Sequence, residues 1–162
     1  MEALVKDPVC GMQIEPDRYV TEYLQSRYAF CSTQCRDRFL ANPHLFIGFP
    51  GQKAPKQEGL EVLKKQRLQV AQLLSPSQAD SLIEALQAMM GIKSVRVDGD
   101  KIEITYDLLQ VTAEQIETKL AEIGVQLGEG WTEQLCRAFV HYAEELEVGS
   151  LEVHNEKNFH QH

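Results

Sequence analysis

The segment Gly48–Gly59, which reads GFPGQKAPKQEG, constrains the fold of this chain more than any other feature. It is rich in Gly, Pro and Lys and has no apolar periodicity that could pack against a core. The segment predicts a linker over residues 49–64, between a small domain at 1–48 and a second domain at 65–148. The last residues, 149–162, are expected to form a flexible tail. A length of 162 residues agrees with two small domains.

Three cysteines lie in the first part with the spacing C-x20-C-x3-C: Cys10, Cys31 and Cys35. Thiols this far apart meet only if the fold brings them together. The stretch RYVTEYLQSRYAF between them predicts a hairpin with LQSR at its centre, which can return Cys10 to the other two. The stretch STQCRDRFLA predicts a helix capped by Ser32, whose exposed N–H groups and dipole stabilise a thiolate at Cys35.

This helix is expected to end before Pro43, because proline disfavours helical geometry at the residue that precedes it. Phe39 and Leu40 are expected to face inward. A domain of this size buries little core, so a metal could stabilise it.

The ligand set favours a soft metal ion. Structural zinc takes four ligands, and this part of the chain offers three cysteines. His44, or Cys136 from the second domain, is a candidate fourth ligand, although His44 lies in a loop and Cys136 is more readily explained as a core residue. Thiolate and thioether ligands favour Cu(I), which accepts two or three ligands, and Met12 lies two residues after Cys10. Cu(I) is therefore the expected ion, with zinc as the alternative.

Composition limits the partners and the chemistry. The formal net charge of -8 argues against nucleic acid as the main partner. The chain has no apolar run long enough to span a bilayer and no signal peptide, so a cytoplasmic protein that is not membrane-embedded is expected. Cytoplasmic cysteines stay reduced. No glycine-rich phosphate loop or metalloprotease motif is present, which predicts a non-enzyme. A thiol redox enzyme, the third alternative, would need an accessible cysteine of low pKa.

The second part alternates strands and helices. RLQVAQLL predicts a strand, and SPSQADSLIEALQAMMG predicts a helix with a capping box at Ser75 and Gln78 and a stop at Gly91. KSVRV and KIEITY predict a hairpin, and TAEQIETKLAEIG predicts a second capped helix that begins at Thr112. VQL predicts a short last strand. This order is the split βαβ, ferredoxin-like pattern, so the fold class is α+β.

A further helix is expected at about Thr132–Glu147, with an apolar side that packs on its domain or on a partner, for example a second copy of the chain in a homodimer. The residues of that side are Leu135, Cys136, Phe139, Val140, Ala143 and Leu146. The tail holds three histidines, which could add weak auxiliary metal binding.

The blocks DPVCGM, YAFCSTQC and FLANPHLF, in this order, resemble the YHS/TRASH family of small metal-binding domains over about residues 5–47. The resemblance implies a treble-clef-like fold with Cys10, Cys31 and Cys35 as metal ligands. It also implies copper or a similar soft metal as cargo, with zinc as a common alternative. Members of this family occur beside heavy-metal-transporting P-type ATPases and in metal-responsive regulators.

The second domain resembles the heavy-metal-associated, copper-chaperone-like domain through LIEAL, GIKSVRV and ITYD, followed by a helix and IGV. That family carries CxxC before its first helix, whereas this chain has Ser75 and Gln78 at the two positions. The resemblance therefore implies this fold without its metal site, and a role in docking, dimerisation or regulation.

These observations together predict a metallochaperone-like protein of metal homeostasis. It would bind copper in trafficking, sensing or resistance and could deliver it to a metal-transporting P-type ATPase. The alternative is a zinc-stabilised interaction or regulatory module without cargo.

Overall fold

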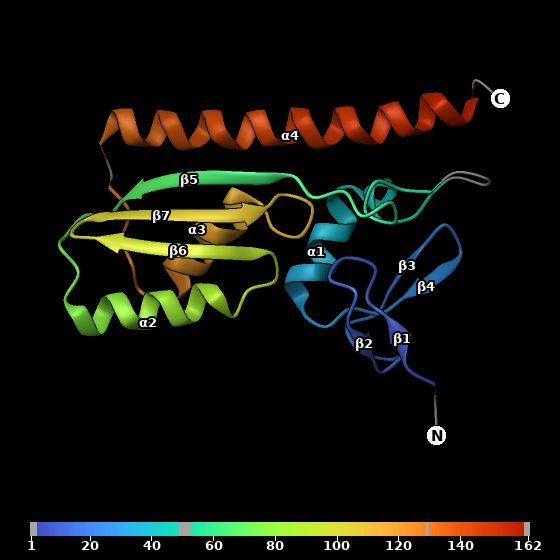
Figure 1. Ribbon diagram of the computed structural model, residues 1–162, viewed down its shortest axis with the longest axis horizontal. Helices are drawn as coiled ribbons and strands as arrows, with labels where there is room; N and C mark the ends of the chain where they lie inside the picture. The colour runs from blue at the N-terminus through green and yellow to red at the C-terminus, as the bar shows by residue number, and fades with distance from the viewer. Residues whose placement is uncertain (1–2, 49–52, 129, 161–162) are drawn as a thin grey trace. The chain divides into compact units, whose positions relative to one another are not determined.

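The computed structural model describes residues 3–48, 53–128 and 130–160, which form parts of two compact units (Figure 1). The first unit comprises residues 1–61 and 146–162, and the second comprises 62–145. The long C-terminal helix α4, Trp131–His160, contributes residues to both units. Within the described ranges, every helix is too short or too polar to cross a membrane.

The first unit is built from two short hairpins and a helix. Strand β1 (Val5–Lys6) pairs with β2 (Gln13–Ile14), and β3 (Thr21–Tyr23) pairs with β4 (Ser26–Tyr28), both antiparallel. The second pair confirms the predicted hairpin. Its turn residues Leu24 and Gln25 have positive φ values of 50° and 66°, as a two-residue hairpin turn of type I′ requires. Helix α1 (Thr33–Ala41) follows, and a 3-10 helix η1 (Pro43–Leu45) begins at the proline that was expected to end α1.

Aromatic rings form the core of the first unit. Phe39 is fully buried, and its ring centroid lies 5.2 Å from that of Phe30 and 6.1 Å from that of Phe46. Leu40 does not face inward as expected, because its side chain is 46% exposed. The neighbouring Arg38 is buried instead. Its guanidinium lies over the Phe46 ring and donates to Asn42 Oδ1 at 3.0 Å. These contacts compensate for the water that the buried cation loses.

The segment expected to be a linker belongs largely to the first unit. Ala54 is fully buried, and Lys56 N–H donates to the carbonyl of Leu45 at 2.9 Å. The unit boundary lies between Glu61 and Val62, whereas the sequence predicted a linker over 49–64. The burial of Ala54 and the hydrogen bond from Lys56 tie the described residues 53–61 to the first unit, and neither contact produces a periodic apolar pattern.

The second unit is a three-stranded antiparallel sheet with two helices. The elements are β5 (Leu63–Gln69), α2 (Pro76–Gln87), β6 (Ile92–Asp98), β7 (Lys101–Asp107) and α3 (Ala113–Glu122), and the strand order is β5-β7-β6. The apolar residues Leu68, Ile102 and Ile104 are buried, as are Leu82 and Leu86 of α2 and Ile116 and Leu120 of α3. This is the expected α+β, ferredoxin-like arrangement.

Two details of this sheet differ from the sequence prediction. Strand β5 begins at Leu63 and ends at Gln69, earlier than RLQVAQLL indicated. The expected last strand, VQL, forms only an isolated bridge between Leu127 and Val70. Most of the outer edge of β5 therefore has no neighbouring strand in the described part of the chain.

Both helices of the second unit begin as predicted. Ser75 Oγ accepts from Gln78 N–H at 3.2 Å, and Gln78 Oε1 accepts from Ser75 N–H at 3.0 Å. Thr112 and Gln115 make the same reciprocal pair at the start of α3. Ser75 and Gln78 thus cap a helix at the positions where the heavy-metal-associated family has cysteines.

In the part of α4 that belongs to the second unit, a polar residue is buried where the sequence predicted a buried apolar side. Glu144 is buried, accepts from the Tyr106 hydroxyl, and accepts from Ala113 N–H at 2.8 Å. By contrast, Phe139 is 68% exposed, and Cys136 is exposed rather than in the core. Helical periodicity identified the apolar stripe, but the paired carboxylate at Glu144 determines which side is buried.

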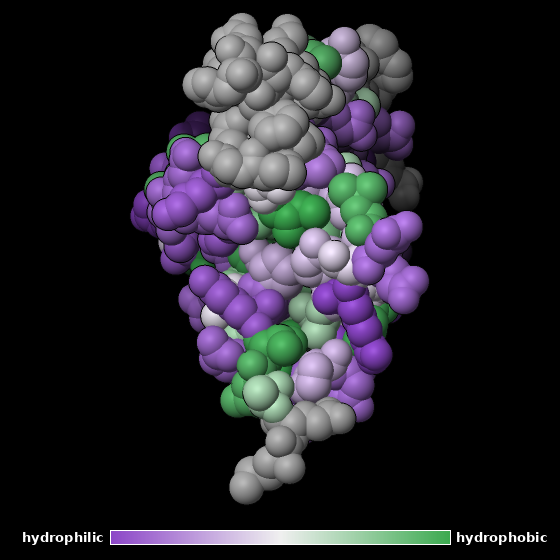
Figure 2. All heavy atoms as spheres, turned by 90° about the vertical axis from the view of Figure 1, so that its right-hand side faces the viewer, coloured by the Kyte–Doolittle hydropathy of each residue, from purple (hydrophilic) through white to green (hydrophobic). Residues whose placement is uncertain are grey.

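Helix α4 also continues to His160, so residues 149–160 are helical where a flexible tail was expected. The segment is anchored within the first unit. Val148 is buried, and the Glu152 carboxylate accepts from His44 N–H at 2.8 Å and from Asn42 Nδ2 at 3.1 Å. These contacts offset the low helix propensity of Gly149. Figure 2 shows the face at the right-hand end of Figure 1, where hydrophilic residues predominate and hydrophobic residues form small separate groups.

Candidate metal centre

A tight loop presents the first cysteine. Asp7 N–H donates to the carbonyl of Met12 at 2.9 Å, and Gly11 N–H donates to the carbonyl of Asp7 at 2.9 Å. Gly11 has a φ of +81°, which disfavours residues with a Cβ atom. The loop therefore folds back on itself and holds Cys10 on the side of β4 and α1.

The carboxylate of Asp7 joins this loop to the segment before α1. It is fully buried. Its Oδ1 accepts from Val9 N–H at 2.7 Å and from Cys10 N–H at 3.3 Å, while its Oδ2 accepts from Cys31 N–H at 2.8 Å. Two cysteines that are far apart in sequence are thus fixed by hydrogen bonds to one carboxylate.

The third cysteine is placed by the start of helix α1. Ser32 is the N-cap residue, and its Oγ accepts from Cys35 N–H at 3.4 Å, as the sequence predicted. Cys35 lies in the first turn of the helix and is fully buried, Cys31 is 8% exposed, and Cys10 is partly exposed. Cys10 is the thiol that solvent reaches most easily.

The three sulfur atoms converge. Cys10 Sγ lies 3.5 Å from Cys31 Sγ, and Cys31 Sγ lies 3.6 Å from Cys35 Sγ. Together with an oxygen of Asp7, their ligand atoms all lie within 4.8 Å of one another, and all three cysteines are free thiols. This donor set of soft sulfurs beside one carboxylate can hold a metal ion. We call Asp7, Cys10, Cys31 and Cys35 the cysteine cluster.

The three thiols differ in acidity. A hydrogen bond from the Cys35 thiol lowers the pKa of Cys10 from 9.0 to about 7, against the opposing effect of burial. Burial raises the pKa of Cys31 to about 11. The pKa of Cys35 is raised, because its thiol donates to Cys10 and is itself buried. A single thiolate centred on Cys10 is therefore the ionised form of the metal-free cluster near neutral pH.

The other candidate ligands have the following surroundings. Met12 is 47% exposed, and its backbone carbonyl closes the Asp7 loop, so a thioether contribution stays a prediction. His44 Nε2 forms a hydrogen bond of 2.9 Å with the Tyr23 hydroxyl, and the ring is not part of the cluster. Cys136 belongs to the second unit.

Asp7 is the cluster residue that sequence reasoning did not select. A lone carboxylate is weak support for a site, but this one precedes a proline and lies two residues before Val9. Aspartate in such a position commonly accepts from the backbone N–H two residues later, as it does here. That turn pattern was the available signal.

Comparison with known proteins agrees with the first resemblance. Residues 5–48 match the sequence model of the YHS domain. No curated protein matches the chain. Solved structures with similarity to part of the chain include oxidized MerP from Ralstonia metallidurans CH34, with 14% identity and a TM-score of 0.39, over 41% of this chain and 96% of that one.

Two further structures are similar to about the same extent. The CsoZ metallochaperone is 16% identical, with a TM-score of 0.39, over 41% of this chain and 99% of that one. The N-terminal soluble domains of Bacillus subtilis CopA are 20% identical, with a TM-score of 0.39, over 42% of this chain and 48% of that one.

Proposed function

We propose that this chain is a metal-trafficking protein whose first unit carries Cu(I) on Cys10, Cys31 and Cys35. The observation that carries the proposal is the approach of the three sulfur atoms, to 3.5 Å and 3.6 Å along the cluster. Thiolates are the protein ligands that Cu(I) prefers. The match of residues 5–48 to the YHS domain supports the same function.

The hydrogen bonds that Asp7 already accepts favour Cu(I) over zinc. Both carboxylate oxygens already accept backbone N–H groups, so Asp7 is engaged in holding the loop and the Cys31 segment together. Three thiolates remain as ligands. This number suits Cu(I) and is one fewer than structural zinc requires.

Transfer of the ion would proceed by ligand exchange, one thiolate at a time. Cys10 is the most exposed of the three cysteines, whereas Cys31 and Cys35 are buried. An acceptor thiolate would therefore displace Cys10 first and the two buried cysteines later. Binding and transfer need no catalysed step, so we assign no enzymatic activity. A metal-transporting P-type ATPase is the acceptor that the YHS resemblance suggests, in a reducing compartment such as the cytoplasm.

A zinc-stabilised interaction module is the second candidate. The observation in its favour is that Asp7 lies in the same 4.8 Å group as the three thiols, which would complete a set of four ligands. Metal removal separates the two functions. A cargo site should leave the first unit folded, whereas a structural zinc site should leave it unfolded.

The test is a Cu(I) titration of the reduced, full-length protein in competition with a chromophoric Cu(I) chelator. We expect Cys31→Ser and Cys35→Ser to lose stoichiometric binding, because each removes one of the convergent ligands. Cys136→Ser is the matched control, since it removes a thiol in the other unit. If both cluster variants keep full stoichiometric Cu(I), the assignment is wrong.

A further inference from the structure

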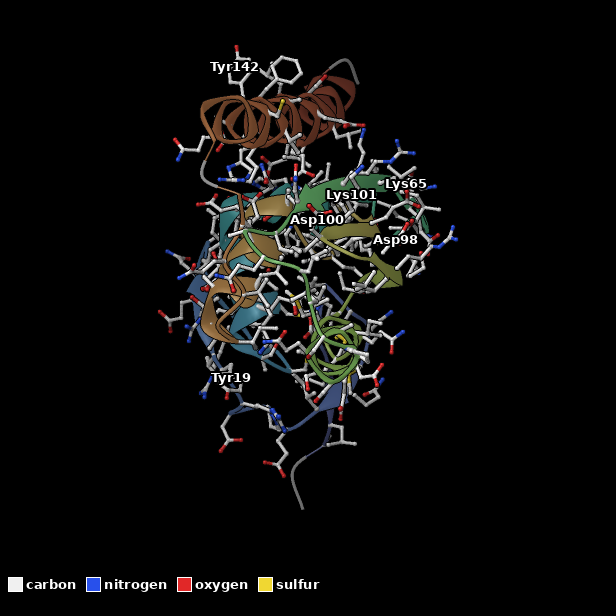
Figure 3. All side chains as sticks on the ribbon, turned by 90° about the vertical axis from the view of Figure 1, so that its left-hand side faces the viewer. Tyr19, Lys65, Asp98, Asp100, Lys101 and Tyr142 are labelled. Carbon is white, nitrogen blue, oxygen red and sulfur yellow. The ribbon has the colours of Figure 1, made fainter. Side chains whose placement is uncertain are left out.

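A groove of about 720 Å³ runs beside strand β5 within the second unit. Its lining includes the consecutive residues Lys65–Gln69 of β5, and Cys136, Arg137 and Val140 of α4. Successive strand residues point to opposite faces of a sheet, so a cavity lined by five in a row reaches the edge of β5. Arg96 and Asp98 of β6 also line it, so the groove extends from this edge across one face of the sheet. Figure 3 shows Lys65 and Lys101 at the strands beside α4, while Tyr142 points away from them on the far side of that helix.

Among the described residues, no strand pairs along most of the edge of β5 that reaches this groove, and α4 forms another wall of the groove. β5 pairs with β7 on one side, and on the other side the described residues provide only the bridge from Val70 to Leu127. Leu108 N–H donates to the carbonyl of Val62, and Val70 N–H donates to the carbonyl of Asp100, so even-numbered residues of β5 face β7. Alternation then directs the backbone N–H and C=O groups of Leu63, Lys65 and Arg67 toward the groove.

The groove is cationic in an acidic protein. Its lining contains five Lys or Arg residues and two acidic residues, whereas the whole chain has a formal charge of -8. Arg67, Glu103 and Arg96 lie in one row across the three strands. Glu103 binds Lys65 at 3.4 Å and Arg67 at 3.2 Å, so one carboxylate serves more than one cation. Arg137 is paired with Glu117 at 3.5 Å. The positive charge that remains on the other lining cations favours an anionic ligand.

We propose that an extended acidic segment of a partner protein binds in this groove as an added strand along Leu63–Arg67 of β5. Its backbone would pair with the outward-facing groups of the strand, and alternate Asp or Glu side chains would lie beside Lys65 and Arg67. The site is set for an acidic peptide rather than a nucleic acid. The open N–H and C=O groups of β5 can pair with a peptide backbone, and a nucleic acid offers no such backbone. This proposal does not depend on metal binding by the first unit.

The first experiment measures fluorescence anisotropy with metal-free, reduced, full-length protein and a labelled peptide in which Thr and Glu alternate. We expect this peptide to bind and the matched Thr–Lys peptide not to bind. Lys65→Glu and Arg67→Glu should each weaken binding about fivefold to tenfold, since each reverses one exposed charge. Lys53→Glu makes the same change in net charge elsewhere on the surface, in the first unit, and should leave binding unchanged. Equal loss with Lys53→Glu, or tighter binding of single-stranded DNA than of the Thr–Glu peptide, would overturn the proposal.

The second experiment tests strand addition itself. Arg67→Pro removes an N–H that points away from β7, whereas Arg67→Ala removes the same side chain and keeps the N–H. We expect Arg67→Pro to bind the Thr–Glu peptide more weakly than Arg67→Ala, and equal binding by two folded variants contradicts strand addition. Hydrogen exchange of the wild-type chain gives an answer even if the proline variant unfolds. The amides of Lys65 and Arg67 should become protected when the peptide is added, and unchanged exchange overturns the proposal.

Discussion

Asp7 and Asp107 play the same part in the two units. Both are fully buried, and both carboxylates accept backbone N–H groups of nearby loops. Asp107 Oδ1 accepts from Val62 N–H at 3.0 Å and from Leu109 N–H at 3.1 Å. Each buried carboxyl group is thus satisfied by hydrogen bonds, which is the condition under which such a polar group can be buried.

Replacing Asp7 by Ala should destabilise the first unit by about 2–4 kcal/mol, because three backbone N–H groups would lose their acceptor. Urea unfolding, with hydrogen exchange to identify the first unit, measures this loss. Asp17→Ala is the control, since Asp17 is exposed and should change stability by less than about 0.5 kcal/mol. A loss no larger than that of the control would mean that the loop holds its shape without this carboxylate.

Alkylation of the metal-free protein by iodoacetamide should begin at Cys10 and rise with pH around a midpoint near 7. The sign follows from the lowered pKa. The thiolate is present above pH 7 and is lost as the pH falls below it, whereas the raised pKa values keep Cys31 and Cys35 as unreactive thiols. Mass spectrometry of peptides after timed alkylation reads each cysteine separately. Modification of Cys35 before Cys10 would contradict this order.

At the scale of elements, local rules predicted most of the fold. Ser32, Ser75 and Thr112 each begin a helix as their capping patterns indicated, and the hairpin turns lie where expected. Each capping or turn signal involves residues close together in the chain, so it can be recognised from the sequence alone. The convergence of the thiols could be expected from spacing, but the part played by Asp7 depends on Cys31, which is distant in the chain.

Which side of α4 is buried could not be predicted from the helix sequence alone. An apolar stripe predicts a buried side, yet Phe139 is exposed and Glu144 is buried. The partners of Glu144 are Tyr106 and the N–H of Ala113, and neither can be inferred from the helix sequence. Long-range polar contacts decide such cases, and a single sequence does not reveal them.

Glu144→Ala should therefore destabilise the second unit by about 2–3 kcal/mol, because it removes the buried carboxylate that accepts from the Tyr106 hydroxyl and from Ala113 N–H. The neighbouring Glu145→Ala provides the control, since Glu145 is exposed. Thermal unfolding followed by circular dichroism compares the two variants. Equal midpoints would show that α4 does not depend on this carboxylate for its packing.

At the scale of the whole molecule, the first unit is discontinuous in sequence, because residues 146–162 join residues 1–61. The Glu152 carboxylate accepts from Asn42 and from His44 at the start of η1, more than a hundred residues away along the chain. This contact satisfies a backbone N–H at a helix start, where such groups lack partners within the helix.

Glu152→Ala should lower the stability of the first unit by about 1–2 kcal/mol, as removal of a helix-capping carboxylate does. Glu152→Gln keeps an acceptor oxygen and should lose less. Hydrogen exchange at His44 and Leu45 measures the local effect, which we expect to exceed any change in the second unit. If exchange at η1 is unaltered in both variants, the contact contributes nothing to stability.

The contact between Glu152 and η1 bears on how this molecule can be divided. The stretch that matches the YHS domain ends at residue 48, yet the compact unit to which it belongs also includes residues 146–162. A fragment that ends at residue 48 would lose the hydrogen bond from Lys56 N–H to the carbonyl of Leu45. It would also lose the Glu152 carboxylate that accepts from His44 N–H at the start of η1. The segment that matches the YHS domain and the compact unit thus have different boundaries, so metal binding is best studied with the full-length chain.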